Sequence, residues 1–291
     1  MDRKIYEIVE MPNGLKMMAV LPIIETGVAE AYATVRDNPL LGVSKGDSGP
    51  FSANLYKLLG QKEGCVDFQT ACRALGISDR TVITNRLTAI TDIVRVVDAS
   101  DLEGYDIYDE PAAPRADGLV TADNRITLFN YAADCAITFM VDPVRKIIGS
   151  HHASWRGSLK GIFESEVHTF VEQGSDPKDI IAVIMPSISK ENFEIGSDAA
   201  EMFEEAGYGR FVDYTSYKKP HADLPAMNRH ILLSTGLREE NVYVIDDQDT
   251  FVDQTLWHSF RRGPIDSNGI HLNGQNGYFI RLKCAHNPIN I

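Results

Sequence analysis

The pattern of apolar and polar positions predicts a β-hairpin near the middle of the chain. Residues 136–141 are apolar and rich in β-branched side chains, an Asp-Pro pair interrupts this run, and a second apolar run covers residues 146–149. Two short antiparallel strands joined by a turn fit this pattern, and the outer ends of such a pair meet in space. We therefore expect Cys135, just before the first strand, to lie near His151 and His152, which follow the second.

Further strands and helices are predicted on both sides of this hairpin. Short apolar runs bounded by Gly, Pro or Asp predict strands at 16–21, 29–35, 80–97 (two runs), 116–121, 126–131, 180–185, 241–245 and 277–282. Helical spacing predicts helices at 67–75, 198–206 and 223–236. The acidic, proline-containing stretch 101–115 is predicted to be a surface excursion. No break in composition divides the chain, so we predict a single α/β domain over residues 1–291, with one mixed sheet and helices outside.

The helix after the hairpin has its own start and stop signals. Ser158 is predicted to cap it, and Gly174 to end it. Between them one apolar stripe recurs at helical spacing, formed by Leu159, Ile162, Phe163, Val167, Phe170 and Val171.

Composition and charge narrow the possible partners. The 291 residues are 44% hydrophobic and carry a net charge of -13, which excludes an extended nucleic-acid groove but leaves room for a local basic pocket. No apolar run reaches the length of a membrane helix, and the N-terminus has no targeting pattern. Four scattered cysteines without a C-x-x-C motif indicate reduced thiols. We expect a cytoplasmic protein that binds neither nucleic acid nor membrane.

A polar, glycine-containing loop follows Arg36 and ends near Ser52 and Asn54. One guanidinium, hydroxyl and amide groups, and free backbone N–H groups are the parts that hold an oxyanion or a phosphate. A plain solvent loop has the same composition, so both interpretations remain.

Three interpretations of Cys135 and His152 follow from their spacing. Thiolate and imidazole are ligands for zinc or copper. The same two groups can form a nucleophile and base pair. They can also be a buried thiol and a hydrogen-bonded imidazole without chemical function.

A set of motifs resembles the YfiH family, also called the laccase-domain or multicopper polyphenol-oxidase-like family, which includes purine nucleoside phosphorylases. The central motif Ala133-Asp-Cys135, Asp142-Pro143 and His152-Ala-Ser-Trp-Arg-Gly157 is similar to the family's A-D-C, D-P and H-A-G-W-R-G. Further similarities, in the family's order, lie at Arg36, 42–44, 52–55, 116–121, 186–188, 193–196 and 259–262.

This resemblance implies an α/β fold related to the catalytic domain of cytotoxic necrotizing toxins. It also implies zinc held by one Cys and two His, and phosphorolysis or deamination of purine nucleosides. Cys135 and His152 match the first two ligands, and Asp134 and Arg156 would orient and charge the site. Ile90 stands where the family has its second histidine. The family's glycine is replaced by Ser154, and its later Cys-Thr pair by Asp249-Thr250. A third ligand would have to come from His151, His258 or Asp249.

We therefore expect a purine nucleoside phosphorylase or deaminase with an altered, zinc-binding or metal-free site; copper fits less well. Arg36, Ser52 and Asn54 would cradle phosphate, and Arg156 would lie near the reacting centre. Two other functions remain: a metal-independent Cys–His hydrolase, and a non-catalytic binding or assembly protein. The sequence does not determine the oligomeric state.

Overall fold

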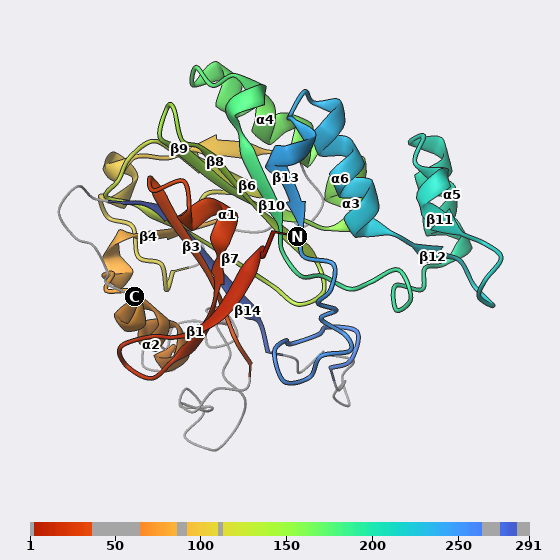
Figure 1. The fold of residues 1–291 in the computed structure, drawn as a ribbon, viewed down its shortest axis with the longest axis horizontal. Helices are drawn as coiled ribbons and strands as arrows, with labels where there is room; N and C mark the ends of the chain where they lie inside the picture. Colours follow the sequence, from red (N-terminus) through yellow and green to blue (C-terminus); the bar gives the residue numbers. More distant parts are fainter. Residues whose placement is uncertain (1–2, 37–64, 86–91, 110–112, 264–273, 284–291) are drawn as a thin grey trace.

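Two six-stranded sheets make up the centre of the fold in the computed structural model, which describes residues 3–36, 65–85, 92–109, 113–263 and 274–283 (Figure 1). The first sheet contains, in spatial order, β1 (Tyr6–Glu10), β2 (Lys16–Val20), β3 (Ala29–Thr34), β14 (Asn276–Leu282), β7 (Thr127–Ala132) and β4 (Val82–Thr84). The second contains β13 (Val242–Val244), β10 (Ile181–Ile184), β8 (Ala136–Asp142), β9 (Ile147–Ala153), β6 (Gly118–Thr121) and β5 (Val94–Val96). A two-stranded ribbon joins β11 (Val212–Asp213) to β12 (His221–Ala222).

The α/β class and the mixed strand directions agree with the sequence prediction, but the single sheet does not. The pairs β4–β7, β10–β13 and β5–β6 are parallel, and the other pairs of the two large sheets are antiparallel. The prediction of one sheet was wrong because periodicity identifies a strand without identifying its neighbours. The chain also returns to the first sheet with β14, far from β3 and β7 in sequence.

The predicted hairpin is confirmed as β8 and β9, but β9 continues to Ala153, so His151 and His152 lie within the strand and not after it as predicted. Ala136 pairs with Ala153 and Ile137 pairs with His152, and the turn is closed by Lys146 at a positive φ of 57°. The Asp142 carboxylate accepts hydrogen bonds from the N–H groups of Val144 (2.8 Å) and Arg145 (2.9 Å). This turn chemistry fixes the register and therefore the position of the hairpin's outer end.

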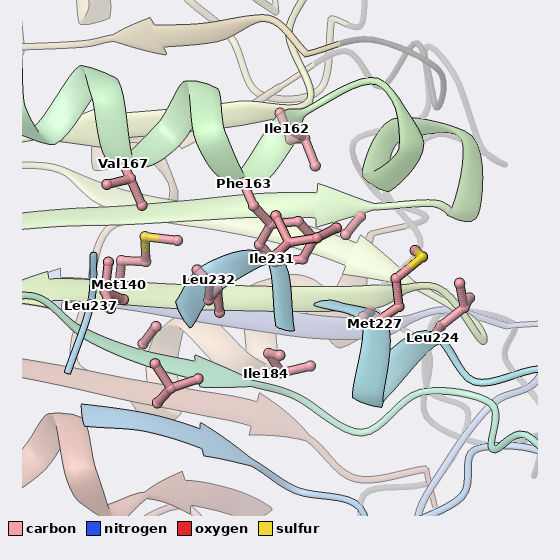
Figure 2. Packing of buried hydrophobic residues seen from close by; sticks show 14 of the residues in the cluster. Met140, Ile162, Phe163, Val167, Ile184, Leu224, Met227, Ile231, Leu232 and Leu237 are labelled. Atoms are coloured by element: carbon pink, nitrogen blue, oxygen red, sulfur yellow. The ribbon is translucent and has the colours of Figure 1, made fainter. Parts of the chain in front are cut away.

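The two sheets pack face to face, and helices cover their outer faces. Side chains of both sheets share one buried cluster that includes Ile137, Ile148, Leu128 and Tyr278. The outer face of the second sheet packs against α4 (Ile162–Glu172) and α6 (Leu224–Ser234), where Phe163, Ile231 and Met140 lie among the core residues (Figure 2). The outer face of the first sheet is covered by α2 (Val66–Ala74). Because strand side chains alternate, successive residues of β9 face either the other sheet or the helices.

Two short helices flank the hairpin and the first sheet. The segment after β9 begins with α3 (Trp155–Leu159), and α1 (Leu21–Ile24) follows β2. Ser154, not Ser158, is the N-cap of α3, with its hydroxyl 3.0 Å from the N–H of Gly157. Gly161 begins α4 at a φ of 95°, so the predicted single helix is broken in two. The prediction of Ser158 as the cap was wrong because Ser154, directly at the strand end, also fits the cap pattern.

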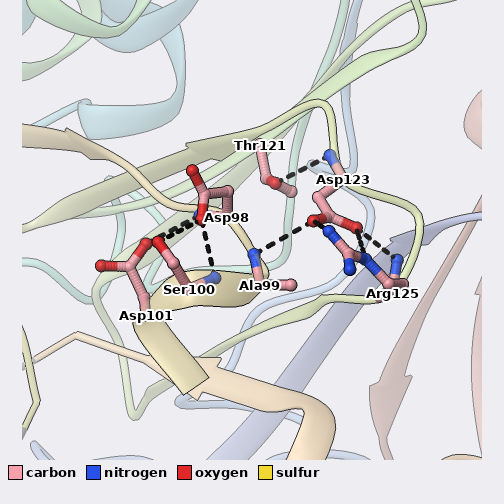
Figure 3. A network of polar contacts seen from close by, with 7 residues as sticks. All are labelled: Asp98, Ala99, Ser100, Asp101, Thr121, Asp123 and Arg125. Carbon is pink, nitrogen blue, oxygen red and sulfur yellow. Dashed lines mark hydrogen bonds and ion pairs between the residues drawn. The ribbon is translucent and has the colours of Figure 1, made fainter. Parts of the chain in front are cut away.

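Polar contacts hold the connection after β5 against the turn between β6 and β7 (Figure 3). Asp98 and Asp101 form a capping box at the 3-10 helix Ala99–Leu102, and the N–H of Ala99 donates to Asp123 at 3.0 Å. Asp123 also binds Arg125, whose guanidinium lowers the pKa of that carboxyl to about 2. The stretch after it differs from the predicted surface excursion, since Ile107 and Tyr108 are buried against α2.

α5 (Ser197–Glu205) lies with the β11–β12 ribbon to one side of the sheets (Figure 1). Among the described helices, none is long and apolar enough to cross a membrane.

Candidate functional site

Cys135 and His152 lie on the same face of the hairpin, at its outer end. His152 on β9 pairs with Ile137 on β8. Cys135 precedes Ile137 by two residues and comes directly before β8. Both side chains therefore point toward the first sheet, where Cys135 packs against the buried inter-sheet cluster. His152 is buried, and Cys135 is partly exposed. The structure thus brings the two predicted residues to one place.

Burial keeps both groups electrically neutral at pH 7. Desolvation raises the pKa of the Cys135 thiol to about 12, and the nearby charges of Asp134 and Asp117 act in the same direction. Desolvation also lowers the pKa of His152 to about 4; Asp117 opposes this shift and His151 adds to it. The site therefore holds a thiol and a neutral imidazole, not a thiolate and an imidazolium.

Asp117 is a site residue that the sequence analysis did not single out. It directly precedes β6, is 1% exposed, and its carbonyl oxygen accepts a hydrogen bond from the N–H of His152 at 2.8 Å. Its charge acts on the pKa of both Cys135 and His152. The sequence could have indicated this residue, since a carboxylate at the start of a buried strand is rarely found without a partner.

Asp134 connects the hairpin to two distant loops. Its carboxylate accepts hydrogen bonds from the hydroxyls of Thr250 (2.8 Å) and Ser259 (3.0 Å) and from the N–H of Arg261 (2.7 Å). Its carbonyl oxygen accepts a fourth from the N–H of Ile188 at 3.0 Å. The residue has a φ of 83°, a region in which Asp is tolerated better than most side chains. Asp134 therefore fixes the loops around Cys135.

Two arginines bind carbonyl oxygens of one segment, residues 250–257, in the same region. Arg36 donates from Nη1 to the carbonyl oxygen of Gln254. Arg262, which lies in the family motif at 259–262 but received no role from the sequence, donates to the carbonyl oxygens of Thr250, Phe251 and Trp257. Burial lowers the pKa of Arg262, and the positive charge of Arg36 lowers it further. Paired guanidinium groups of this kind attract an anion.

The other predicted phosphate ligands, Ser52 and Asn54, lie outside the described residues, as does Ile90.

Arg156 is placed on the outside of α3. Its guanidinium carbon lies 3.9 Å from the ring centroid of Trp155, which in turn stacks on Phe203 at 5.8 Å. Arg156 is exposed, and it is not among the charges that shift the pKa of Cys135 or His152. Its role near the reacting centre stays a prediction.

The side chains offered as a third metal ligand have other positions. The His151 imidazole faces the helices and binds Glu166. Asp249 accepts hydrogen bonds from the Asn192 amide (2.7 Å) and the N–H of Phe251 (2.7 Å). The main chain of His258 is held by the side-chain amide of Asn276. Within the described part of the chain, no group of three His, Cys, Asp or Glu residues could hold a metal ion, so these residues do not fit a three-ligand zinc site.

A family model described as "Multi-copper polyphenol oxidoreductase laccase" matches residues 38–282. The chain is 35% identical over 127 residues to a purine nucleoside phosphorylase of Deinococcus radiodurans, covering 44% of this chain and 50% of that one. It is 32% identical over 154 residues to purine nucleoside phosphorylase YlmD of Bacillus subtilis, covering 52% and 55%. The chain thus spans about half the length of these two relatives.

It is also 30% identical over 185 residues to adenosine deaminase RL5 of an unknown prokaryotic organism, covering 62% of this chain and 68% of that one.

Solved structures show the same fold at low sequence identity. The hypothetical protein YfiH of Bacillus licheniformis superposes with a TM-score of 0.78 at 21% identity, covering 97% of this chain and 100% of that one. YlmD of Geobacillus stearothermophilus gives 0.79 at 20% identity, with the same coverage. These similarities show that the chain shares the fold of these two proteins.

Proposed function

We propose, from the premise that this chain belongs to the YfiH family of multi-copper polyphenol oxidoreductase laccases, that it is an enzyme of purine nucleoside phosphorolysis. Its relatives include proteins named purine nucleoside phosphorylases. The observation that carries the proposal is the Asp134 network: one carboxylate joins the Cys135 end of the hairpin to the segment that bears Arg262, and Arg262 and Arg36 both bind carbonyl oxygens of residues 250–257.

The reaction requires a binding site for the phosphate anion and hydrogen-bonding groups beside the nucleoside. It requires little covalent assistance. An oxygen of phosphate forms a bond to C1′ of the ribose while the bond from C1′ to N9 breaks, and the purine leaves with the electron pair and takes up a proton. Ribose 1-phosphate and the free base are the products. Holding the two reactants together and stabilising the charges of the transition state supply most of the acceleration in such reactions.

Residues on both sides of the site can share these tasks. Arg36 and Arg262 would attract phosphate, and Ser52 and Asn54, which lie outside the described residues, would complete its cradle. His152 and Cys135 are neutral at pH 7, so they would act as hydrogen-bonding groups beside the base or ribose. Asp134 would keep the arginine-bearing segment against the hairpin.

The neutral state of Cys135 and His152 favours this function over the Cys–His hydrolase. A thiol nucleophile reacts as the thiolate, and catalytic cysteines lie in surroundings that lower their pKa. Here two carboxylates and burial raise it. The copper-dependent oxidation in the family's name also fits this site less well than phosphorolysis does, because a multi-copper site requires several clustered histidines. The described donors do not complete a three-ligand zinc site, so the roles assigned to these residues involve no metal ion.

The proposal is tested by incubating the purified protein with inosine, guanosine or adenosine and phosphate, with and without added zinc. Ribose 1-phosphate and free base are the expected products, and inosine formed from adenosine would reveal the activity for which the RL5 relative is named. His152→Gln should abolish product formation, whereas His168→Gln, at an exposed position on α4, should not change it. Absence of all these products under both conditions would favour the non-catalytic binding protein.

A further inference from the structure

A second histidine and a glutamate are buried on the reverse face of the strand that carries His152. His151 and Glu166 each have no exposed surface, and His151 Nδ1 is bonded to Glu166 Oε2. The edge of the imidazole also contacts the ring of Phe163, with centroids 4.5 Å apart and an interplanar angle of 89°. Two side chains of helix α4 thus contact His151, the residue next to His152 on β9.

The strands are shaped to accept this carboxylate. A Cβ atom at Gly149 would lie 2.2 Å from Glu166 Oε1, and a Cβ at Gly118 would lie 3.2 Å from His151 Cβ and 3.5 Å from Glu166 Oε2. Gly118 and His151 are paired across β6 and β9. Two glycines on adjacent strands therefore make the space that Glu166 fills, so the pair is built into the sheet.

Burying the polar side chains of His151 and Glu166 costs free energy that an apolar pair would not cost. Among the described residues, His151 Nε2 and Glu166 Oε1 have no hydrogen-bond partner, although both atoms are buried. A buried polar atom without a partner costs about 1–3 kcal/mol, and replacing a buried ion pair by apolar side chains is often neutral or stabilising. Stability alone does not explain the presence of these two residues.

We propose that His151 and Glu166 are positioning residues for His152. Neighbouring residues of a strand point to opposite faces, so fixing the direction of His151 fixes the direction of His152. The N–H of His152 is held by the carbonyl oxygen of Asp117 at 2.8 Å, which secures the same point of the strand from its edge. The contact with α4 and the contact with Asp117 together hold the backbone of His152, and therefore the direction in which its side chain leaves β9 on the Cys135 side. Only the expected loss of phosphorolysis rests on the proposed function; the positioning of His152 does not.

The test replaces the pair by an apolar one, in the double variant His151→Phe with Glu166→Met. Stability should be unchanged or higher, kcat for phosphorolysis should fall about 10- to 100-fold with little change in KM, and the ring signals of His152 in a histidine-labelled NMR spectrum should move. The His152 signals are identified by their loss in His152→Gln. Phe170→Leu, on the same helix, serves as the control: it should lower stability and leave the His152 signals in place.

Unchanged His152 signals in the double variant would overturn the proposal, whether or not its stability falls. If the double variant does not fold, Glu166→Gln decides by the same two measurements. A wild-type protein that cleaves no nucleoside would refute the proposed function, while the NMR signals would still test the positioning of His152.

Discussion

The carboxylate of Asp134 accepts a hydrogen bond from the main-chain N–H of Arg261 at 2.7 Å, across 127 residues of sequence. The same carboxylate holds the hydroxyls of Thr250 and Ser259. Asp134 stands directly beside Cys135, so the hairpin that carries the thiol and the loops that carry the arginines are assembled around one side chain. A single substitution there should affect both the stability and the site.

We predict that Asp134→Asn destabilises the protein and removes phosphorolysis. The amide keeps one acceptor oxygen, but its NH2 group would face donors that now meet a carboxylate, which costs about 1–3 kcal/mol. Asn tolerates the positive φ at this position, so the backbone is not an added source of strain. Urea unfolding and ribose 1-phosphate formation measure the two effects.

Thr250→Val is the matched comparison, because it removes only one of the donors to Asp134. Its loss of stability should be smaller than that of Asp134→Asn. Equal losses in the two variants would mean that the carboxylate does not act as the common anchor.

Cys135 should react slowly with iodoacetamide at neutral pH. Its pKa is raised to about 12, so the thiolate that reacts is scarce at pH 7 and increases with each pH unit. Mass spectrometry of the Cys135 peptide between pH 7 and pH 10 should show a rate that keeps rising without a plateau. A plateau near pH 7 would indicate an activated thiol and would revive the hydrolase interpretation.

His152 should make the wild-type protein lose stability as the pH falls. Its pKa is lowered from 6.5 to about 4 in the folded state, so between these values the unfolded chain takes up a proton that the folded chain refuses. The free energy of unfolding should therefore fall, relative to that of His152→Gln, by up to about 1.4 kcal/mol per pH unit over this window. Urea titrations of the two proteins at pH 4.5, 5.5, 6.5 and 7.5 measure the difference; parallel curves would contradict the shift.

The sequence predicted the hairpin well because its information is local. The apolar runs and the turn at Asp142 follow from neighbouring residues, and so does the placing of Cys135 near His152. The end of β9 was missed, because the strand continues through His151 and His152, which are polar and do not extend the apolar run. The face of each strand also follows from alternation, which separates His151 from His152. The helix start was wrong: Ser158 was predicted as the cap, whereas α3 begins at the end of β9 with Ser154 as its cap and α4 follows Gly161.

Partners distant in sequence could not be predicted in the same way. Nothing near Glu166 indicates that its carboxylate fills a space left by Gly118 and Gly149, and nothing near Arg262 indicates that it binds the same segment as Arg36. These contacts depend on how the two sheets and α4 pack. The division of the strands into two sheets was missed for the same reason.

Phosphate should stabilise the wild-type protein through Arg36. Arg36 and Arg262 bind the same segment, and the positive charge of Arg36 acts on Arg262. An anion bound there would relieve their mutual repulsion, and a ligand bound only by the folded state raises the melting temperature. Phosphate at 100 times its Kd would add about 2.7 kcal/mol to the free energy of unfolding. The comparison uses sodium chloride at equal ionic strength, since salt alone screens the charges. Arg36→Gln should lose most of the phosphate effect, and Arg125→Gln, at an exposed arginine paired with Asp123, should keep it. An equal response of all three proteins would place the phosphate elsewhere, and the anion site assigned to Arg36 would then have to be abandoned.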